Sequence, residues 1–358
     1  MTISLLLLLS IPCFAADLAE ELHAADAASN LPADAAAALD GLSPMVTDVD
    51  LDGGLERVIN YVNLKFRGLL TEALRPAAAV IAVSAICAAA GPMALAEQGK
   101  FDYVNFGGCM AVAAASVADV QSVIAMGNET IEALWEYSHT LLPTLTTAAV
   151  SAGAVTSAGA KYAAAALFSD LLLTAAQSFI FPLICGYVAA VTAGAALGTG
   201  QLSGAARLLQ WASRTAMKAL VAAFTGYLAL TGILSGGADA AAVKAAKAVL
   251  STAVPVVGGT LASASESLVA GAGLVRNAIG AFGLLAILAA VAIPVLRLGL
   301  RYLLFKAAAA VSAVLAGGRL GGLIEAMGTA YGLVLGLVGT AAAVSFLSVV
   351  SLMKTVIP

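Results

Sequence analysis

The sequence predicts an all-α protein, a polytopic transmembrane helical bundle of about eight spans with one re-entrant hairpin and an N-terminal signal peptide. Three observations predict this class. Hydrophobic residues form 61% of the 358-residue chain and charged residues only 11%, against roughly 45–50% and about 25% in soluble domains. The mean hydropathy is +0.99. Apolar runs close to the roughly 20 residues that a helix needs to cross a bilayer recur through most of the chain.

The first 54 residues are predicted to lie outside the membrane. Residues 1–15 resemble a secretory signal peptide, because an apolar core precedes the small-residue site Cys13-Phe14-Ala15. Cleavage there would leave the N-terminus of the mature chain outside the cytoplasm. Residues 16–54 are rich in Ala and Asp and poor in large apolar side chains, so we expect a flexible, acidic, external segment.

Residues 55–74 have the pattern of an amphipathic helix. Apolar residues recur at helical spacing from Leu55 and Val58 onward, while Glu56 and Arg57 fall on the opposite face. We expect this helix to lie on the outer membrane surface. Docking on a partner protein is the alternative.

Residues 75–358 form the predicted membrane domain. Three glutamates and aromatic anchors predict an outer loop at 128–139, and a turn at Phe181-Pro182 would divide an apolar run too long for one crossing. Most basic residues then fall in cytoplasmic loops, with Arg319 in an outer turn. Eight spans are predicted at 77–96, 103–126, 141–160, two short ones within 163–197, 219–235, 278–296 and 328–352, and a marginal ninth at 302–316.

Residues 248–275 are predicted to form the re-entrant hairpin. Pro255, Gly258 and Gly259 break an apolar run whose two halves are each shorter than the roughly 20 residues of a full span. Non-helical backbone at membrane depth persists only where protein or a water-filled cavity covers it. These three residues are therefore candidates for a structural or conduit role.

Charged residues inside apolar runs are further candidates, because each costs roughly 2.5–3.5 kcal/mol at the centre of a span. Asp170 lies deepest in its run, and Glu266 and Arg276 flank the outgoing half of the hairpin. The alternative is that Glu266 and Arg276 reach water or an interface, and that a small shift of the span boundaries brings Asp170 to the surface. Asp119 is expected to reach an interface.

Glycines at helix-contact spacing predict close helix packing. Gly328, Gly332 and Gly336 mark one face of a single predicted span. Such faces let helix backbones approach closely in lipid, where hydrophobic drive between helices is missing. A compact bundle or a homo-oligomer is expected.

The sequence argues against several function classes. The chain has two histidines and no pair of closely spaced cysteines, so we expect no metal site, and neither a phosphate-binding loop nor a catalytic motif is present. We therefore predict neither catalytic residues nor a cofactor. The net charge of −4 argues against a nucleic-acid partner.

Residues 244–280, reading KAAKAVLSTAVPVVGGTLASASESLVAGAGLVRNAIG, resemble the signature region of the stage III sporulation protein AE family. The shared pattern is a Lys-bearing helix start, Pro-Val-Val-Gly-Gly, and a Gly-containing helix leading to Arg276-Asn277-Ala278. The family often has Ser-Asp after the glycines, where this chain has Ala262-Ser263-Ala264. Glu266 is at best a displaced substitute for that acid.

The resemblance implies a multi-pass protein of the mother-cell membrane around the forespore. Its implied partners are the other stage III sporulation membrane proteins encoded with it and a forespore protein. Together they would form a channel or secretion-like complex that sustains forespore development. The alternative is a self-sufficient secondary transporter of a small solute, because such carriers build substrate sites from broken helices.

Overall fold

The computed structural model describes residues 31–40, 51–94, 103–198, 201–253 and 258–354. The predicted signal peptide and Pro255 lie outside these ranges. Side chains between 231 and 271 also fall outside the description, although most of this stretch is helical.

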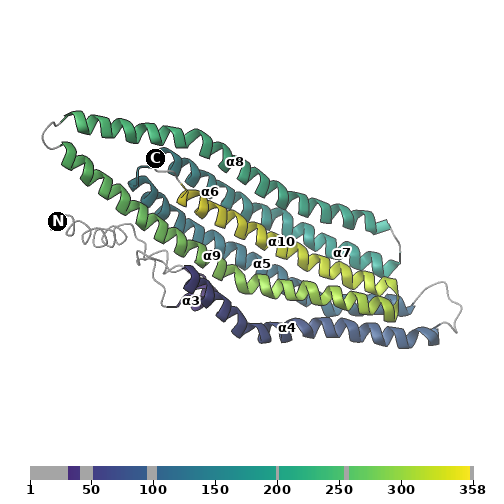
Figure 1. The fold of residues 1–358 in the computed structure, drawn as a ribbon. Coiled ribbons are helices and arrows are strands. Elements are labelled where there is room, and N and C mark those ends of the chain that lie inside the picture. Colours follow the sequence, from purple (N-terminus) through teal and green to yellow (C-terminus); the bar gives the residue numbers. More distant parts are fainter. Residues whose placement is uncertain (1–30, 41–50, 95–102, 199–200, 254–257, 355–358) are drawn as a thin grey trace.

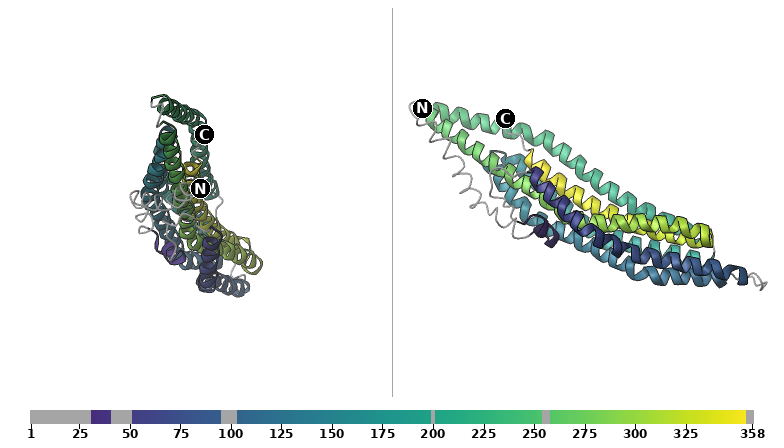
Figure 2. Two further views of the ribbon diagram at one scale, coloured as in Figure 1. Left: turned by 60° about the vertical axis from the view of Figure 1, so that its left-hand side comes forward. Right: turned by 60° about the horizontal axis from the view of Figure 1, so that its bottom comes forward.

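The described chain consists of helices that run up and down one elongated bundle (Figures 1 and 2). At one end, on the right of Figure 1, α4, α7 and α9 finish and α5, α8 and α10 begin; this is called the α9–α10 end below. The connection from α8 to α9 lies at the opposite end. The helices are α3 (Ala33–Ala38), α4 (Leu51–Ala94), α5 (Tyr103–Ser151), α6 (Val155–Ala175), the π-helical η1 (Ala176–Ile180), α7 (Phe181–Leu197), α8 (Gln201–Ala253), α9 (Gly258–Ala316) and α10 (Gly318–Met353).

Glycines in left-handed or related conformations form three of the turns between these helices. Gly153 follows α5 with φ 92°, Gly198 ends α7 with φ 68°, and Gly317 separates α9 from α10 with φ 87°. Side chains other than hydrogen are strained at such angles. The chain therefore reverses direction at points where glycine is the residue best suited to do so.

The hairpin of α9 and α10 forms the centre of the bundle. In their most apolar windows, 72% of α9 and 56% of α10 is buried, against 22% of α4. Phe305 of α9 meets Tyr331 of α10 edge to face, with ring centroids 4.7 Å apart. The other helices surround this hairpin and keep large apolar side chains on their outer faces.

Five stretches of helix among the described residues are long and apolar enough to cross a membrane, at 51–90, 106–151, 155–197, 272–316 and 318–353. The predicted eight-span path differs because three expected loops are helical. Residues 128–139 belong to α5, and the three glutamates there are exposed on one face while Ile131, Leu134 and Tyr137 are buried on the other. The three glutamates thus form the exposed face of an amphipathic helical segment, and the predicted outer loop is wrong.

The predicted turn at Phe181-Pro182 is also wrong. α6, η1 and α7 follow one another without a reversal, and Pro182 stands in the first turn of α7. The π-helical turn η1 directly before Pro182 accommodates the proline, because the Phe181 N–H there bonds to the Ala176 carbonyl oxygen five residues back and the regular hydrogen-bond pattern of the α-helix is already interrupted. Likewise 278–296 and 302–316 are parts of the single helix α9.

The predicted re-entrant hairpin does not form a separate short element. Residues 248–253 end the long helix α8, and 258–275 begin the long helix α9. The expected amphipathic helix 55–74 is likewise continuous with the predicted first span, as the first half of α4. The changes between apolar and charged sequence predict ends of helices, but in the structure they fall inside uninterrupted helices.

Part of the segment expected to be flexible packs on the bundle. α3 lies against α9, and Ala35 and Leu39 are buried. The Tyr61 hydroxyl donates a hydrogen bond to Asp34 Oδ1 at 3.1 Å, and Arg57 Nη1 donates to the Asp40 carbonyl oxygen at 2.9 Å. The polar face of α4 therefore holds residues 32–40 in place.

Candidate functional site

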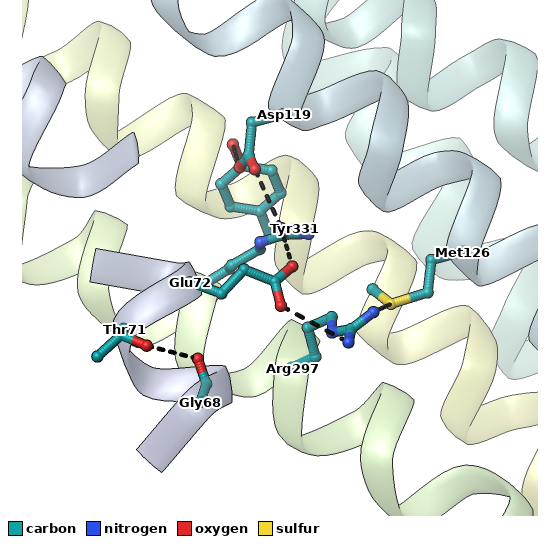
Figure 3. Close-up of polar contacts among 8 residues, drawn as sticks. Gly68, Thr71, Glu72, Asp119, Met126, Arg297 and Tyr331 are labelled. Atoms are coloured by element: carbon teal, nitrogen blue, oxygen red, sulfur yellow. Dashed lines mark hydrogen bonds and ion pairs between the residues drawn. The ribbon is translucent and has the colours of Figure 1, made fainter. Parts of the chain in front are cut away.

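A buried cluster of charges joins four helices and is the main candidate site (Figure 3). We call it the charge cluster. Its members are Glu72 of α4, Asp119 of α5, Arg297 and Arg301 of α9, and Tyr331 of α10.

Arg301 is the centre of the charge cluster. Its Nη2 lies 3.1 Å from Glu72 Oε1 and 3.3 Å from Asp119 Oδ1. The Tyr331 hydroxyl donates to the other carboxylate oxygen of Asp119, Oδ2, at 2.7 Å. One guanidinium therefore connects α9 to both α4 and α5, and Asp119 extends the connection to α10.

Arg297 completes the charge cluster one helical turn before Arg301. Residues four apart lie on the same helix face, so both guanidinium groups point toward α4 and α5. Arg297 Nη2 lies 3.6 Å from Glu72 Oε2, and its Nη1 donates to the Met126 sulfur at 3.6 Å. Glu72 thus stands between two arginines (Figure 3).

The charge cluster holds two positive and two negative side chains, and one pair is more buried than the other. The Arg301 and Asp119 side chains are 5% and 13% exposed, whereas those of Arg297 and Glu72 are 34% and 46% exposed. The inner pair has lost most of its contact with solvent, so each charge depends on the other for stabilisation. Arginine keeps its proton in proteins, so protons could be exchanged only by the two carboxyl groups and the tyrosine.

Asp170 lies elsewhere, on the outside of the bundle between α5 and α6. Its Oδ1 accepts a hydrogen bond from Trp135 Nε1 at 2.7 Å and lies 3.1 Å from His139 Nε2. The rings of Trp135 and His139 are 4.3 Å apart. The Asp170 side chain is 56% exposed, so the deepest position in the apolar run is a surface position of the bundle.

The hairpin residues take no part in the charge cluster. Gly258 and Gly259 are the first residues of α9, and Glu266 follows in the same helix with its side chain undescribed. Arg276 lies further along α9 and is buried, at 6% exposure. These candidates therefore lie in the first third of α9, whereas Arg297 and Arg301 lie later in the same helix and Asp170 lies on α6.

The three glycines of α10 face two different neighbouring helices, α9 and α8. A Cβ at Gly328 would lie 3.3 Å from Phe305 Cβ, and one at Gly332 would lie 3.0 Å from the Tyr302 ring, both on α9. A Cβ at Gly336 would lie 3.5 Å from the Met217 sulfur on α8. These glycines thus allow close contacts inside one chain.

Of the charge cluster, only Asp119 stands out in the sequence, as a residue expected to reach an interface, and the convergence of the five side chains was missed. Arg297 and Arg301 follow the predicted span 278–296, among the basic residues expected in cytoplasmic loops, and Glu72 belongs to the predicted surface helix 55–74. The available signal was an arginine pair at i and i+4 within an apolar run, with one acid in each of two other runs. In the described residues no three His, Cys, Asp or Glu side chains converge as metal ligands would.

Comparison with known proteins identifies the family of the chain. The family model for stage III sporulation protein AE matches residues 77–355, which include α5 to α10 and the apolar half of α4. No curated protein matches the chain, and no solved structure does. The matched region covers most of the sequence, so the chain belongs to the stage III sporulation protein AE family.

Proposed function

We propose that this chain is a membrane-embedded structural subunit of a channel or secretion-like complex that links mother cell and forespore and is required for forespore development. Membership of a sporulation family supports the biological setting. The partners would be the other stage III sporulation membrane proteins, a forespore protein and further copies of this chain. The complex would lie in the mother-cell membrane, with the N-terminus of the chain outside the cytoplasm.

The observation that carries this proposal is the length of the helices. α5 has 49 residues and is about 74 Å long at about 1.5 Å per residue. Tyr103 and Val150, near its two ends, are 73% and 38% exposed and lie about 70 Å apart along the helix. The hydrocarbon core of a bilayer is about 30 Å thick.

Tilt does not remove this mismatch. At a tilt of about 40°, the upper end of the usual range, a helix keeps roughly 26 residues within the hydrocarbon layer. About half of α5 would still lie outside it. On α4, the half farthest from the α9–α10 end exposes Leu55, Ile59 and Leu64 at 41%, 49% and 79%. Exposed apolar side chains beyond the lipid are best covered by protein, as expected for a subunit of a larger assembly.

The charges indicate which half the bilayer would enclose. All charged residues of α4 lie between Asp52 and Arg75, and the first in α5 is Asp119. The stretches nearest the α9–α10 end, residues 76–94 of α4 and 103–118 of α5, are thus uncharged. We place the bilayer around this part of the bundle, with the charge cluster at its boundary.

Site-specific photo-crosslinking in sporulating cells tests this proposal. A photoreactive residue at Leu64, which is 79% exposed on α4, should give adducts with another stage III sporulation protein or with a second copy of the chain. The matched control is Val58, which is 3% exposed on the same helix and should give only adducts within the chain. Adducts with lipid alone at Leu64 would count against a partner-covered surface.

The self-sufficient transporter is the second candidate, and the charge cluster is the observation that favours it. Ionisable residues between membrane helices mark ion pathways in many carriers. Purified protein that moves a solute into liposomes without partners would establish that function. A deletion strain that sporulates normally would exclude the structural subunit proposed above.

A further inference from the structure

A groove opens at the α9–α10 end between α7, α8 and α10. Its volume is about 260 Å³, and Ala, Gly, Val and Leu form most of its lining. Gly194 of α7, Ala206 of α8 and Gly322 of α10 are among these residues. The small side chains leave room beside three closely packed helices, and the resulting surface suits an apolar chain better than a polar solute.

Two arginines stand beside this groove. Arg319 lines it directly, and Arg207 Nε donates to the carbonyl oxygen of Ser203, another lining residue, at 3.3 Å. Among the residues that the structure describes, neither arginine has a carboxylate partner. Nearby Glu325 is paired with Lys306, with Oε1 and Nζ 2.9 Å apart. The mouth of the groove is therefore positively charged.

We propose that this groove binds one anionic phospholipid, whose phosphate contacts Arg319 and Arg207 and one of whose acyl chains enters the groove. Basic pockets between membrane helices recognise anionic headgroups in this way. The groove is smaller than the roughly 300 Å³ at which drug-sized ligand pockets begin, so it would enclose only part of one chain. The remaining length could stay in the bilayer, which fits an amphiphile rather than a soluble metabolite. This inference does not depend on the proposed complex.

Native mass spectrometry of the purified full-length chain tests the proposal, with phosphatidylglycerol and phosphatidylcholine as probes. The wild-type chain should retain one phosphatidylglycerol in preference to phosphatidylcholine. Arg319→Gln should weaken this retention about fivefold, the loss expected for one cation near an anionic headgroup. Glutamine keeps hydrogen-bond donors for the end of α7, where the Arg319 guanidinium lies against Gly198.

Gly322→Leu tests the apolar part of the groove separately. A Cβ at Gly322 would meet no atom within 4 Å, so the leucine should fill the groove without disturbing the helices. Gly339→Leu is the matched control, because Gly339 lies on the same helix, also has open space and lies outside the groove. We expect Gly322→Leu to lose the bound lipid and Gly339→Leu to keep it, at equal thermal stability.

Three results would overturn the lipid site. Equal retention of phosphatidylcholine would remove the role of the arginines, and undiminished retention in both Gly322→Leu and Arg319→Gln would place the lipid elsewhere. Displacement of phosphatidylglycerol by soluble glycerol phosphate would make this a site for free anions. If Gly322→Leu fails to fold, Arg319→Gln together with the competition experiment decides the question.

Discussion

Arg301→Met should destabilise the bundle far more than Arg297→Met, the other arginine substitution in the charge cluster. The substitution removes the cation between Asp119 and Glu72 and leaves a side chain of similar length. Asp119 is 13% exposed and would keep only the Tyr331 hydroxyl among its described partners. Breaking a buried ion pair from one side costs about 3–5 kcal/mol, because the other charge is left without compensation.

Arg297→Met is the matched control on the same face of α9. Its contact with Glu72 is longer, at 3.6 Å, and both side chains are about one third exposed or more. Solvent screens such a pair, so its loss should cost less than about 1 kcal/mol. The unfolding midpoint of purified full-length protein, titrated with denaturing detergent and followed by circular dichroism, compares the two variants.

A double variant isolates the cause. Asp119→Asn removes the charge that Arg301→Met leaves unpaired and keeps an oxygen that accepts the Tyr331 hydrogen bond. The combination should therefore be more stable than Arg301→Met alone, with a coupling energy beyond that of independent sites. Equal stability of Arg301→Met and Arg297→Met, or further destabilisation in the double variant, would refute this account of the charge cluster.

Three further predictions follow from other contacts. Lys306→Met should lower stability by more than about 1 kcal/mol by the same unfolding assay, because it leaves the Glu325 carboxylate without its cation in the part of the bundle that we place in the bilayer. Gly332→Leu should cost roughly 1–3 kcal/mol through overpacking against Tyr302, whereas Gly339→Leu, with open space at its Cβ, should be nearly neutral. Trp135→Phe should cost about 1 kcal/mol by removing the hydrogen bond to the exposed Asp170, and a measured change above about 3 kcal/mol would contradict this.

The class of the protein could be read from composition, but the helix boundaries could not. Glu129, Glu132 and Glu136 lie on one face of a helix, and their spacing of three and four residues was the available signal. It was outweighed by the expectation that acidic residues between apolar runs form a loop. In a bundle longer than the bilayer, a helix passes from lipid to water without ending, so a change in polarity ceases to mark a turn.

The charge cluster could not be predicted because it depends on helix register. Placing Glu72 and Asp119 opposite Arg301 requires that α4, α5 and α9 run side by side with known offsets, and no local pattern fixes these offsets. The prediction that a span ends just before Arg297 also placed both arginines in a loop. In the structure α9 continues for fifteen residues beyond Arg301, so both side chains lie inside the bundle-forming helix. Pairing of helices across the bundle is a tertiary property.

α4 and α5 are uncharged near the α9–α10 end, whereas α8 carries exposed charges there, and this difference limits what can surround the bundle. Arg207, Arg214 and Lys218 are exposed along one face of the half of α8 near the α9–α10 end. Acyl chains could cover that face only at roughly 2.5–3.5 kcal/mol for each deeply placed charge. Contact with lipid headgroups, water or an acidic partner surface costs these charges less free energy than contact with acyl chains. The apolar outer faces of α4 and α5 and the basic face of α8 therefore require different surroundings at the same depth, which an assembly can supply and a uniform belt of lipid cannot.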